Sequence, residues 1–276
     1  MKNNFKNRLF QLISIVMLLA ILLVGCNSGT NNENTITDDG ALPVGGKPID
    51  NSTDRDEGNT SGKKRVAITF DDGPHNVYTK KIVDELAKYG AHATFFVVGN
   101  RVDGTEYNGK AALQYAIENG NEIGIHGYTH QKYYNRCSDE EYKYELSSTL
   151  SAIRSVSAST KVNLMRPIGG AITDERVDNC SYAVIMWDVD SEDWKNKYSN
   201  NDSGEEKQAK AELIANNIIS TVREDSIILM HDIYKSTYDA LVIVLERLYA
   251  EGYEVVTVSD LIGNDLQSGE KYYSGR

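Results

Sequence analysis

The stretch Val66-Ala-Ile-Thr-Phe-Asp-Asp-Gly-Pro74 organises the rest of the chain. Its apolar, β-branched and aromatic residues predict a buried strand, and the Gly-Pro pair cannot continue one. Asp71 and Asp72 therefore fall at the carboxyl end of this strand. Because adjacent residues of an extended chain point to opposite sides, one carboxylate can face a metal ion while the other faces substrate or water. Taken alone, the stretch could also be a polar turn.

The first 26 residues have the layout of an export signal. Three basic residues precede an apolar run, which ends in small residues before Cys26. This pattern predicts a bacterial lipoprotein signal with Cys26 as the lipidated first residue of the mature chain. A plain signal peptide and an uncleaved membrane anchor are the alternatives. We expect the protein to be exported and held by its lipid at the outer face of the cytoplasmic membrane.

Composition and charge limit the classes of function. The 276 residues are 40% hydrophobic and 25% charged, which is typical of a globular protein with one sizeable core. The formal net charge is −11, and loss of residues 1–26, with three positive side chains and no negative one, would make it −14. So acidic a chain is a poor ligand for nucleic acid or anionic lipid. Cys137 and Cys180 have no diagnostic spacing, so their pairing stays open.

Patterning divides the chain into four parts: the signal, a disordered polar tether over 27–64, a folded domain over 65–263 and a loose tail over 264–276. In the folded part, short strands alternate with helices about a dozen residues long, which predicts an α/β fold with a parallel sheet. Seven such units in about 200 residues favour a single distorted (β/α)7–8 barrel, whose chemistry gathers where its strands end.

Two histidines follow the third predicted strand, residues 122–125. His126 and His130 are four residues apart, and this spacing places two imidazoles on one face of a helical turn, where they can share a metal ion. With Asp72 they make a set of two histidines and one carboxylate that leaves coordination positions open for water and substrate. Zinc is the ion we expect, although cobalt, nickel or iron would also suit these ligands.

Three further charged residues follow later strands. His231 comes after the strand predicted at 226–230, and it is a candidate general acid because imidazole titrates near neutral pH. Arg166 and Asp193 could each belong to an exposed ion pair or a solvated loop. Together they supply a cation for one carboxylate and a carboxylate for one imidazolium.

These five segments, in this order at successive strand ends, resemble the polysaccharide deacetylase family, carbohydrate esterase family 4. The resemblance covers about residues 65–262 and implies the distorted β/α barrel of that family. It is specific in residues 69–74, in the His126–His130 pair, in residues 190–194 and in residues 229–231.

The resemblance implies a role for each matched residue. The metal ligands would be Asp72, His126 and His130. Acid–base catalysis would use Asp71 as general base, His231 as general acid, Arg166 to orient the base and Asp193 to tune the acid. Substrate contacts would come from Trp194 and Leu229, which line the acetyl pocket, and from the amide of Gly169, which helps to hold the oxyanion.

The sequence departs from the family pattern at two places. Gly127 follows the first metal histidine, where the family has a serine or threonine whose hydroxyl braces the loop. Ile168 and Gly169 stand where the family has a second proline and an aromatic residue. Neither change removes a reacting group, but both bear on the shape of the sugar-binding groove.

The predicted function is that of a hydrolase, a metal-dependent N-deacetylase that removes acetyl groups from N-acetylglucosamine units of peptidoglycan. The alternatives are a chitooligosaccharide deacetylase, an acetylxylan esterase and a carbohydrate-binding lipoprotein without turnover. We expect a monomer whose partners are an extracytoplasmic polysaccharide and, through Cys26, the membrane.

Overall fold

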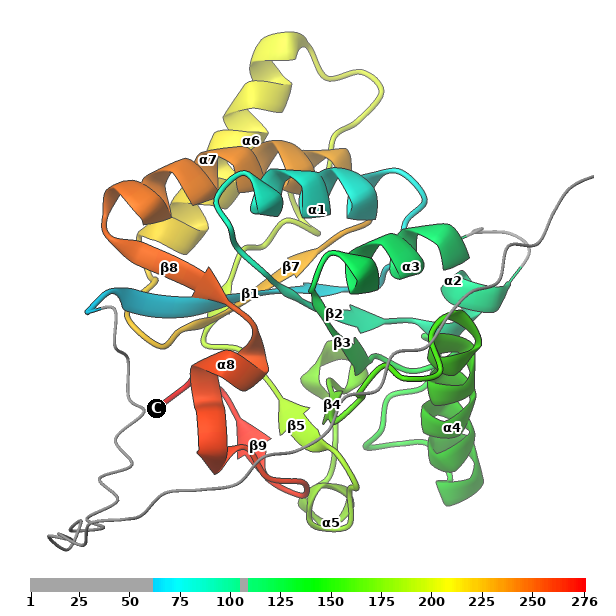
Figure 1. Cartoon of the computed structure of the whole chain (residues 1–276). Helices are drawn as coiled ribbons and strands as arrows, with labels where there is room; N and C mark the ends of the chain where they lie inside the picture. Colours follow the sequence, from blue (N-terminus) through cyan, green and yellow to red (C-terminus); the bar gives the residue numbers. More distant parts are fainter. Residues whose placement is uncertain (1–61, 105–108) are drawn as a thin grey trace, which may run out of the picture. The chain divides into compact units, whose positions relative to one another are not determined.

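Parallel strands and helices alternate along residues 62–104 and 109–276, the part of the chain that the computed structural model describes (Figure 1). The strands are β1 (Lys64–Asp71), β2 (Thr94–Val97), β3 (Glu122–Ile125), β4 (Leu164–Met165), β5 (Ala183–Ile185), β6 (Val189–Asp190), β7 (Ile227–His231), β8 (Tyr253–Val256) and β9 (Lys271–Tyr272). The helices are α1 (Tyr78–Ala87), α2 (Gly99–Asp103), α3 (Lys110–Glu118), α4 (Asp139–Val156), α5 (Asp174–Asp178), α6 (Gly204–Ile219), α7 (Lys235–Ala250) and α8 (Val258–Ile262), with short 3₁₀ turns η1 (Ile168–Gly170) and η2 (Gly263–Asp265).

The sheet runs in the order β6-β7-β1-β2-β3-β4-β5-β9, and β8 pairs with the first half of β1. All of its ladders are parallel. Strands β5 and β6 lie far apart in this order, yet only residues 186–188 separate them in sequence. The sheet must therefore curl, so that residues 183–190 can pair with β4 through β5 and then with β7 through β6. The predicted distorted barrel is confirmed, and the single strand expected at 183–189 is split because its pairing partner changes.

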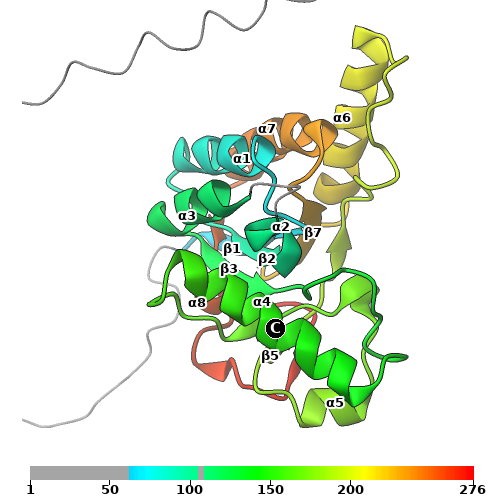
Figure 2. The same ribbon diagram turned by 90° about the vertical axis from the view of Figure 1, so that its right-hand side faces the viewer.

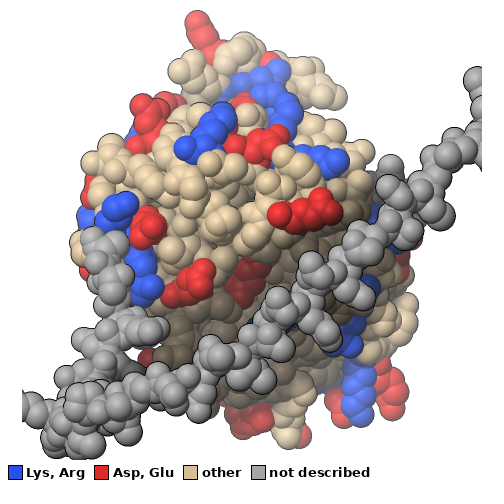
Figure 3. Space-filling view, viewed as in Figure 1, with Lys and Arg blue, Asp and Glu red and all other residues tan. Residues whose placement is uncertain are grey.

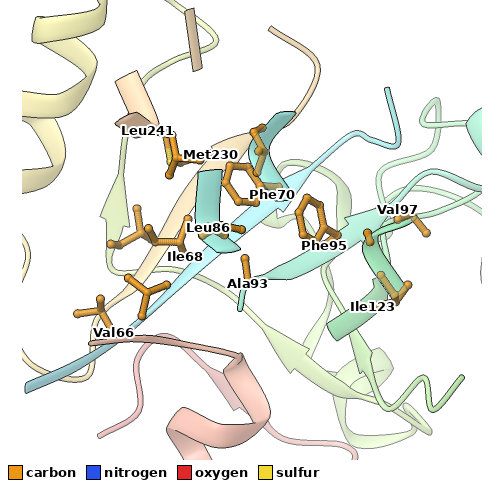
Figure 4. Close-up of a cluster of buried hydrophobic side chains, with 14 of the residues drawn as sticks. Val66, Ile68, Phe70, Leu86, Ala93, Phe95, Val97, Ile123, Met230 and Leu241 are labelled. Atoms are coloured by element: carbon orange, nitrogen blue, oxygen red, sulfur yellow. The ribbon is translucent and has the colours of Figure 1, made fainter. Parts of the chain in front are cut away.

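The two faces of β1 face two different cores. Val66, Ile68 and Phe70 point outward and pack with Leu86 of α1 and Leu241 of α7 (Figure 4). The alternate residues point into the barrel, where α8 closes one end of a second, smaller core that contains Ala67, Phe96, Leu164, Ala183, Ile185, Ile227, Val258, Leu261 and Ile262. Because side chains alternate along a strand, Thr69 and Asp71 share the inward face with Ala67.

Helices cover the outside of the curled sheet. Figures 1 and 2 both show α1, α3 and α7 side by side over β1 and β2, and α6 packs on α7. Helix α4 packs against α2. Ser138 and Glu141 form a capping box that fixes the residue at which α4 begins. This start places α4 directly after the segment that carries the two predicted metal histidines.

The prediction of a loose tail over residues 264–276 is wrong. Residues 271–272 form β9 beside β5, and the amides of Val184 and Met186 donate to Glu270 and Tyr272 at 2.9 and 2.7 Å. Arg276 then pairs with Asp188 at 3.3 Å. The exposed edge of β5 would otherwise carry unpaired N–H groups, and the tail satisfies them. Polar composition alone does not reveal this pairing.

The remaining predictions concern the two cysteines, the tether and the signal. Both Cys137 and Cys180 are free thiols. Residues 62–64 of the expected tether are described, and Lys64 already belongs to β1. The predicted signal, the predicted lipidation site Cys26 and the predicted tether up to residue 61 lie outside the described residues. Within the described ranges, no helix is long and apolar enough to cross a membrane.

Candidate active site

The candidate site lies where β1, β3, β4 and β7 end. In the β1 ladders, Asp71 lies opposite Phe96 of β2 and His231 of β7. His126 directly follows β3, and its amide donates to Val97 at 2.9 Å. The register of the parallel strands therefore brings residues from four distant segments to one end of the barrel, as the sequence predicts.

Asp72, His126 and His130 form a cluster that can hold a metal ion. Their ligand atoms all lie within 4.8 Å of one another. Asp72 Oδ1 is 2.8 Å from His130 Nε2 and 3.5 Å from His126 Nε2. Asp72 reaches both histidines because its backbone is left-handed, with φ 73°, and its carboxylate therefore does not follow the alternation of β1. The histidines lie in an irregular loop and not on the expected helical turn, because φ at His130 is 58°.

The chemistry of these atoms fits a divalent cation. His126 Nδ1 lies 2.9 Å from the carbonyl oxygen of Arg166, to which it donates, so Nε2 is the nitrogen that faces Asp72. Asp72 Oδ1 is buried, and within the described residues no hydrogen bond of good geometry reaches it. Burial would raise the pKa of Asp72, but the two imidazoles outweigh it and lower the pKa, so the carboxylate is ionised. A divalent ion placed where these three ligand atoms converge would take the place of the protons on the imidazoles.

Asp71 is held on one side only. Arg166, fully buried inside the barrel, donates from Nη1 to Asp71 Oδ1 at 2.9 Å and to Thr69 Oγ1 at 2.7 Å. Its Nε and Nη2 donate to the carbonyls of residues 185 and 186 at 3.0 and 2.8 Å. The other carboxylate oxygen, Asp71 Oδ2, lies 3.6 Å from His126 Nε2. One oxygen is thus fixed by a permanent cation, and the other faces the metal ligands.

His231 is held by Asp193. The buried Asp193 carboxylate accepts from the His231 amide at 2.8 Å and from Thr237 Oγ1 at 2.6 Å, and its Oδ1 lies 2.7 Å from His231 Nδ1. Burial opposes protonation of His231, but Asp193, with Asp72 and Asp71 behind it, raises the pKa to about 9. His231 is therefore an imidazolium at neutral pH, with Nδ1 committed to Asp193 and the proton on Nε2 available.

Backbone strain concentrates at this site. Among the described residues, four that are not glycine have a positive φ, and three of them, Asp72, His130 and Glu192, lie in the segments that carry the predicted ligands and the predicted acid pair. Left-handed conformations at such residues cost free energy and persist where the surrounding contacts over-determine them.

The three residues predicted to contact substrate, Leu229, Trp194 and Gly169, are placed by the fold but are not hydrogen-bonded to the charged residues of the site by any contact described above. Leu229 is buried on β7 two residues before His231, and so it points to the same face of the strand. Trp194 follows Asp193 and is 45% exposed. Gly169 lies in η1 against the ring of Tyr133. Their roles in the acetyl pocket and oxyanion site stay predictions.

Sequence reasoning missed Thr69 and Thr237, the hydroxyl groups that support the two charged pairs. Thr69 could have been found, because strand alternation places it beside Asp71 on the inward face. Thr237 had no local signal, since it lies in α7, 44 residues from Asp193.

Comparisons with known proteins agree with this geometry. A model of the polysaccharide deacetylase family matches residues 58–183. A peptidoglycan-N-acetylglucosamine deacetylase of Bacillus cereus is 33% identical over 73% of this chain and 90% of its own length. The cobalt-bound structure of a family 4 acetyl xylan esterase from Clostridium thermocellum is 30% identical, with a TM-score of 0.65 over 76% of this chain and 98% of that one. The chain therefore belongs to the polysaccharide deacetylase family, as the sequence resemblance predicted.

Another relative is longer than this chain. The peptidoglycan-N-acetylglucosamine deacetylase PgdA of Listeria monocytogenes is 31% identical over 76% of this chain, but the match spans only 41% of the relative. The matched region is thus less than half of that protein.

Proposed function

We propose that the chain is a metal-dependent deacetylase that removes acetyl groups from N-acetylglucosamine units of peptidoglycan. One observation carries the proposal: the Asp72–His126–His130 cluster lies beside the carboxylate of Asp71, which accepts a hydrogen bond from Arg166 on its other side. The same barrel end also holds an imidazole tied to a carboxylate. A nucleophile, a base and an acid can therefore act on one acyl group.

The choice of peptidoglycan rests on the relatives. Two of them, from Listeria monocytogenes and Bacillus cereus, are named peptidoglycan-N-acetylglucosamine deacetylases. Surface charge agrees, because the net charge is −11, and on the face drawn in Figure 3 Lys and Arg are interspersed with Asp and Glu. Such a surface does not favour nucleic acid. A cell-wall substrate also suits the lipid anchor on Cys26 at the outer face of the membrane, which we propose from the apolar run before that cysteine.

The metal would be held by Asp72, His126 and His130, and zinc is the ion we propose. When bound, it supplies Lewis-acid chemistry: it polarises the acetyl carbonyl and lowers the pKa of water. One carboxylate with two imidazole nitrogens, and open coordination positions, suits a catalytic zinc ion.

The protein groups handle the protons. Asp71 accepts a proton from the attacking water at Oδ2, while Arg166 keeps Oδ1 in place. His231 then donates the proton on Nε2 to the departing amine, because an amine leaves poorly unless it is protonated. Asp193 holds the imidazole through Nδ1 and stabilises its charged form. The amide of Gly169 is the proposed donor to the oxyanion, and Trp194 with Leu229 would line the acetyl pocket.

A second candidate function is hydrolysis of O-acetyl groups on xylan. It is supported by the acetyl xylan esterase structure, with its TM-score of 0.65. An alcohol is a better leaving group than an amine, so an ester substrate depends less on His231.

The test is acetate release by the purified chain from peptidoglycan, chitopentaose and acetylxylan in parallel, with added zinc and with a chelator. We expect release from peptidoglycan that needs the metal. Faster release from acetylxylan or chitopentaose would favour those substrates. Saccharide binding without release from any of the three, with metal shown to be bound, would contradict the enzymatic proposal and favour a carbohydrate-binding lipoprotein.

A further inference from the structure

The loop between the two metal histidines, residues 127–129, is held through its carbonyl groups by α2. The amide of Gly99 donates to the Gly127 carbonyl at 2.9 Å, and the amide of Asn100 donates to the Tyr128 carbonyl at 3.0 Å. These donors belong to the first turn of α2, whose amides lack partners within the helix. One side of the loop backbone is thus attached to a neighbouring helix.

The amide side of the same loop is held by Glu145. This residue of α4 is 1% exposed, and its Oε2 accepts from the amides of Tyr128 and Thr129 at 2.5 and 2.8 Å. Its Oε1 accepts from the hydroxyl of Thr129 at 2.5 Å. Successive amides form a concave site that suits an anion, and hydrogen bonds to a carboxylate are stronger than neutral ones. A single buried carboxylate therefore takes three donors from the metal-binding loop.

Gly127 makes this approach possible. Its φ is +87°, and a Cβ atom there would lie 2.8 Å from Tyr134 Oη and 3.0 Å from Glu145 Oε2. A side chain at this position would therefore collide with the Tyr134 hydroxyl and crowd the carboxylate that holds the loop. The departure from serine or threonine at Gly127 thus does not leave the loop unsupported, since Glu145 supplies the brace.

The two histidines differ in how they are anchored. His126 is buried, with Nδ1 bonded to the Arg166 carbonyl, and this contact does not depend on Glu145. The side chain of His130 is 40% exposed, and its position follows from the loop that precedes it. Loss of Glu145 should therefore change the position of His130 relative to His126 and Asp72.

We propose that Glu145 is a positioning residue of the metal site: by binding the amides of residues 128 and 129, it fixes His130 against His126 and Asp72 and raises the affinity for a divalent ion. The inference rests on the proposed metal dependence but not on the substrate. It assigns Glu145 a role in metal affinity without contact to the ion.

The experiment measures zinc affinity of the purified full chain by competition with a chromophoric chelator. We expect Glu145→Ala to weaken zinc binding by about 10- to 100-fold, as is typical for partners that orient metal ligands. Glu145→Gln should weaken it less than Glu145→Ala but measurably, because an amide oxygen still accepts both N–H groups without the charge. The matched control is Glu140→Gln, an exposed residue of the same helix, which should bind zinc like the wild type. His126→Ala gives the baseline without the site.

A second readout separates positioning from general stability. Melting temperatures are measured for the apo and the zinc-loaded chain, and the gain on adding zinc should shrink in both Glu145 variants. A lower apo melting temperature with wild-type zinc affinity would overturn the inference and leave the proposed function intact. If Glu145→Ala does not fold, Glu145→Gln decides, and unchanged affinity in it overturns the inference. Failure of the wild type to bind zinc would overturn both the inference and the metal-dependent function.

Discussion

The two charged pairs of the site, Asp71 with Arg166 and Asp193 with His231, each join a carboxylate to a cation. They differ in which partner is held in place and which is left to react. On the first side the cation is permanent and buried, and the carboxylate keeps one oxygen toward the metal ligands. On the second side the carboxylate is buried with all its contacts internal, and the cation can titrate. The partner that is fixed decides the chemistry of the other one. Fixing the cation leaves a base, and fixing the carboxylate leaves an acid.

The largest effect should come from the base side. Asp71→Asn keeps the hydrogen bond to Arg166 but removes the proton acceptor, so kcat for acetate release should fall by about 10²- to 10⁴-fold. Bound zinc should stay stoichiometric, because the three ligands are unchanged. Steady-state kinetics and metal analysis check this, with Asp178→Asn, an exposed carboxylate of α5, as the control. Undiminished acetate release by Asp71→Asn would show that Asp71 is not the base.

A smaller effect, visible mainly in the pH profile, should come from the acid side. The pKa of His231 is raised to about 9, so the group is protonated below that pH and loses its proton as the pH rises through it. In Asp193→Asn the pKa should fall by about 1–3 units, and the alkaline limb of kcat/KM should move down by the same amount.

The substrate sharpens this test of the acid side. The shift in Asp193→Asn should reduce N-deacetylation at pH 8 more than hydrolysis of an O-acetyl ester. A pH profile identical to that of the wild type would show that His231 is not the titrating acid.

The smallest effects should come from the hydroxyl groups behind each pair. Thr69 Oγ1 accepts from Arg166 and donates to the Ile228 carbonyl at 2.6 Å, whereas Thr237 makes one bond to Asp193. Replacement by valine should cost about 1–3 kcal/mol of unfolding free energy at each site, more at Thr69, because buried partners lose a hydrogen bond. Urea unfolding measures this, with Thr221→Val at an exposed position as the control. Equal losses at all three positions would show that neither pair depends on its hydroxyl.

Much of the site could be read from local pattern. Strand ends were marked by residues that stop a strand, such as Gly73-Pro74, and reactive residues after them could be assigned to one end of a barrel. The spacing of His126 and His130 indicated a shared metal, although the loop geometry differs from the helical turn expected. Contacts from distant helices could not be read in this way. Glu145 and Thr237 lie in helical segments where a single polar residue carries no local sign of its partner.

Local sequence pattern was enough to predict the alternation of strands and helices, the inward face of β1 and the residue types available for metal, base and acid. These follow from periods of two and 3.6 residues, which are local properties of the backbone. Only the tertiary contacts could show where residues 183–190 change from one strand partner to another, and that residues 271–272 join the sheet. They also show that Asp71 keeps one carboxylate oxygen toward the metal ligands, whereas both oxygens of Asp193 are bonded within the protein. Each of these depends on the pairing of groups far apart in sequence, since a buried N–H or carboxylate takes the partner that the fold brings to it.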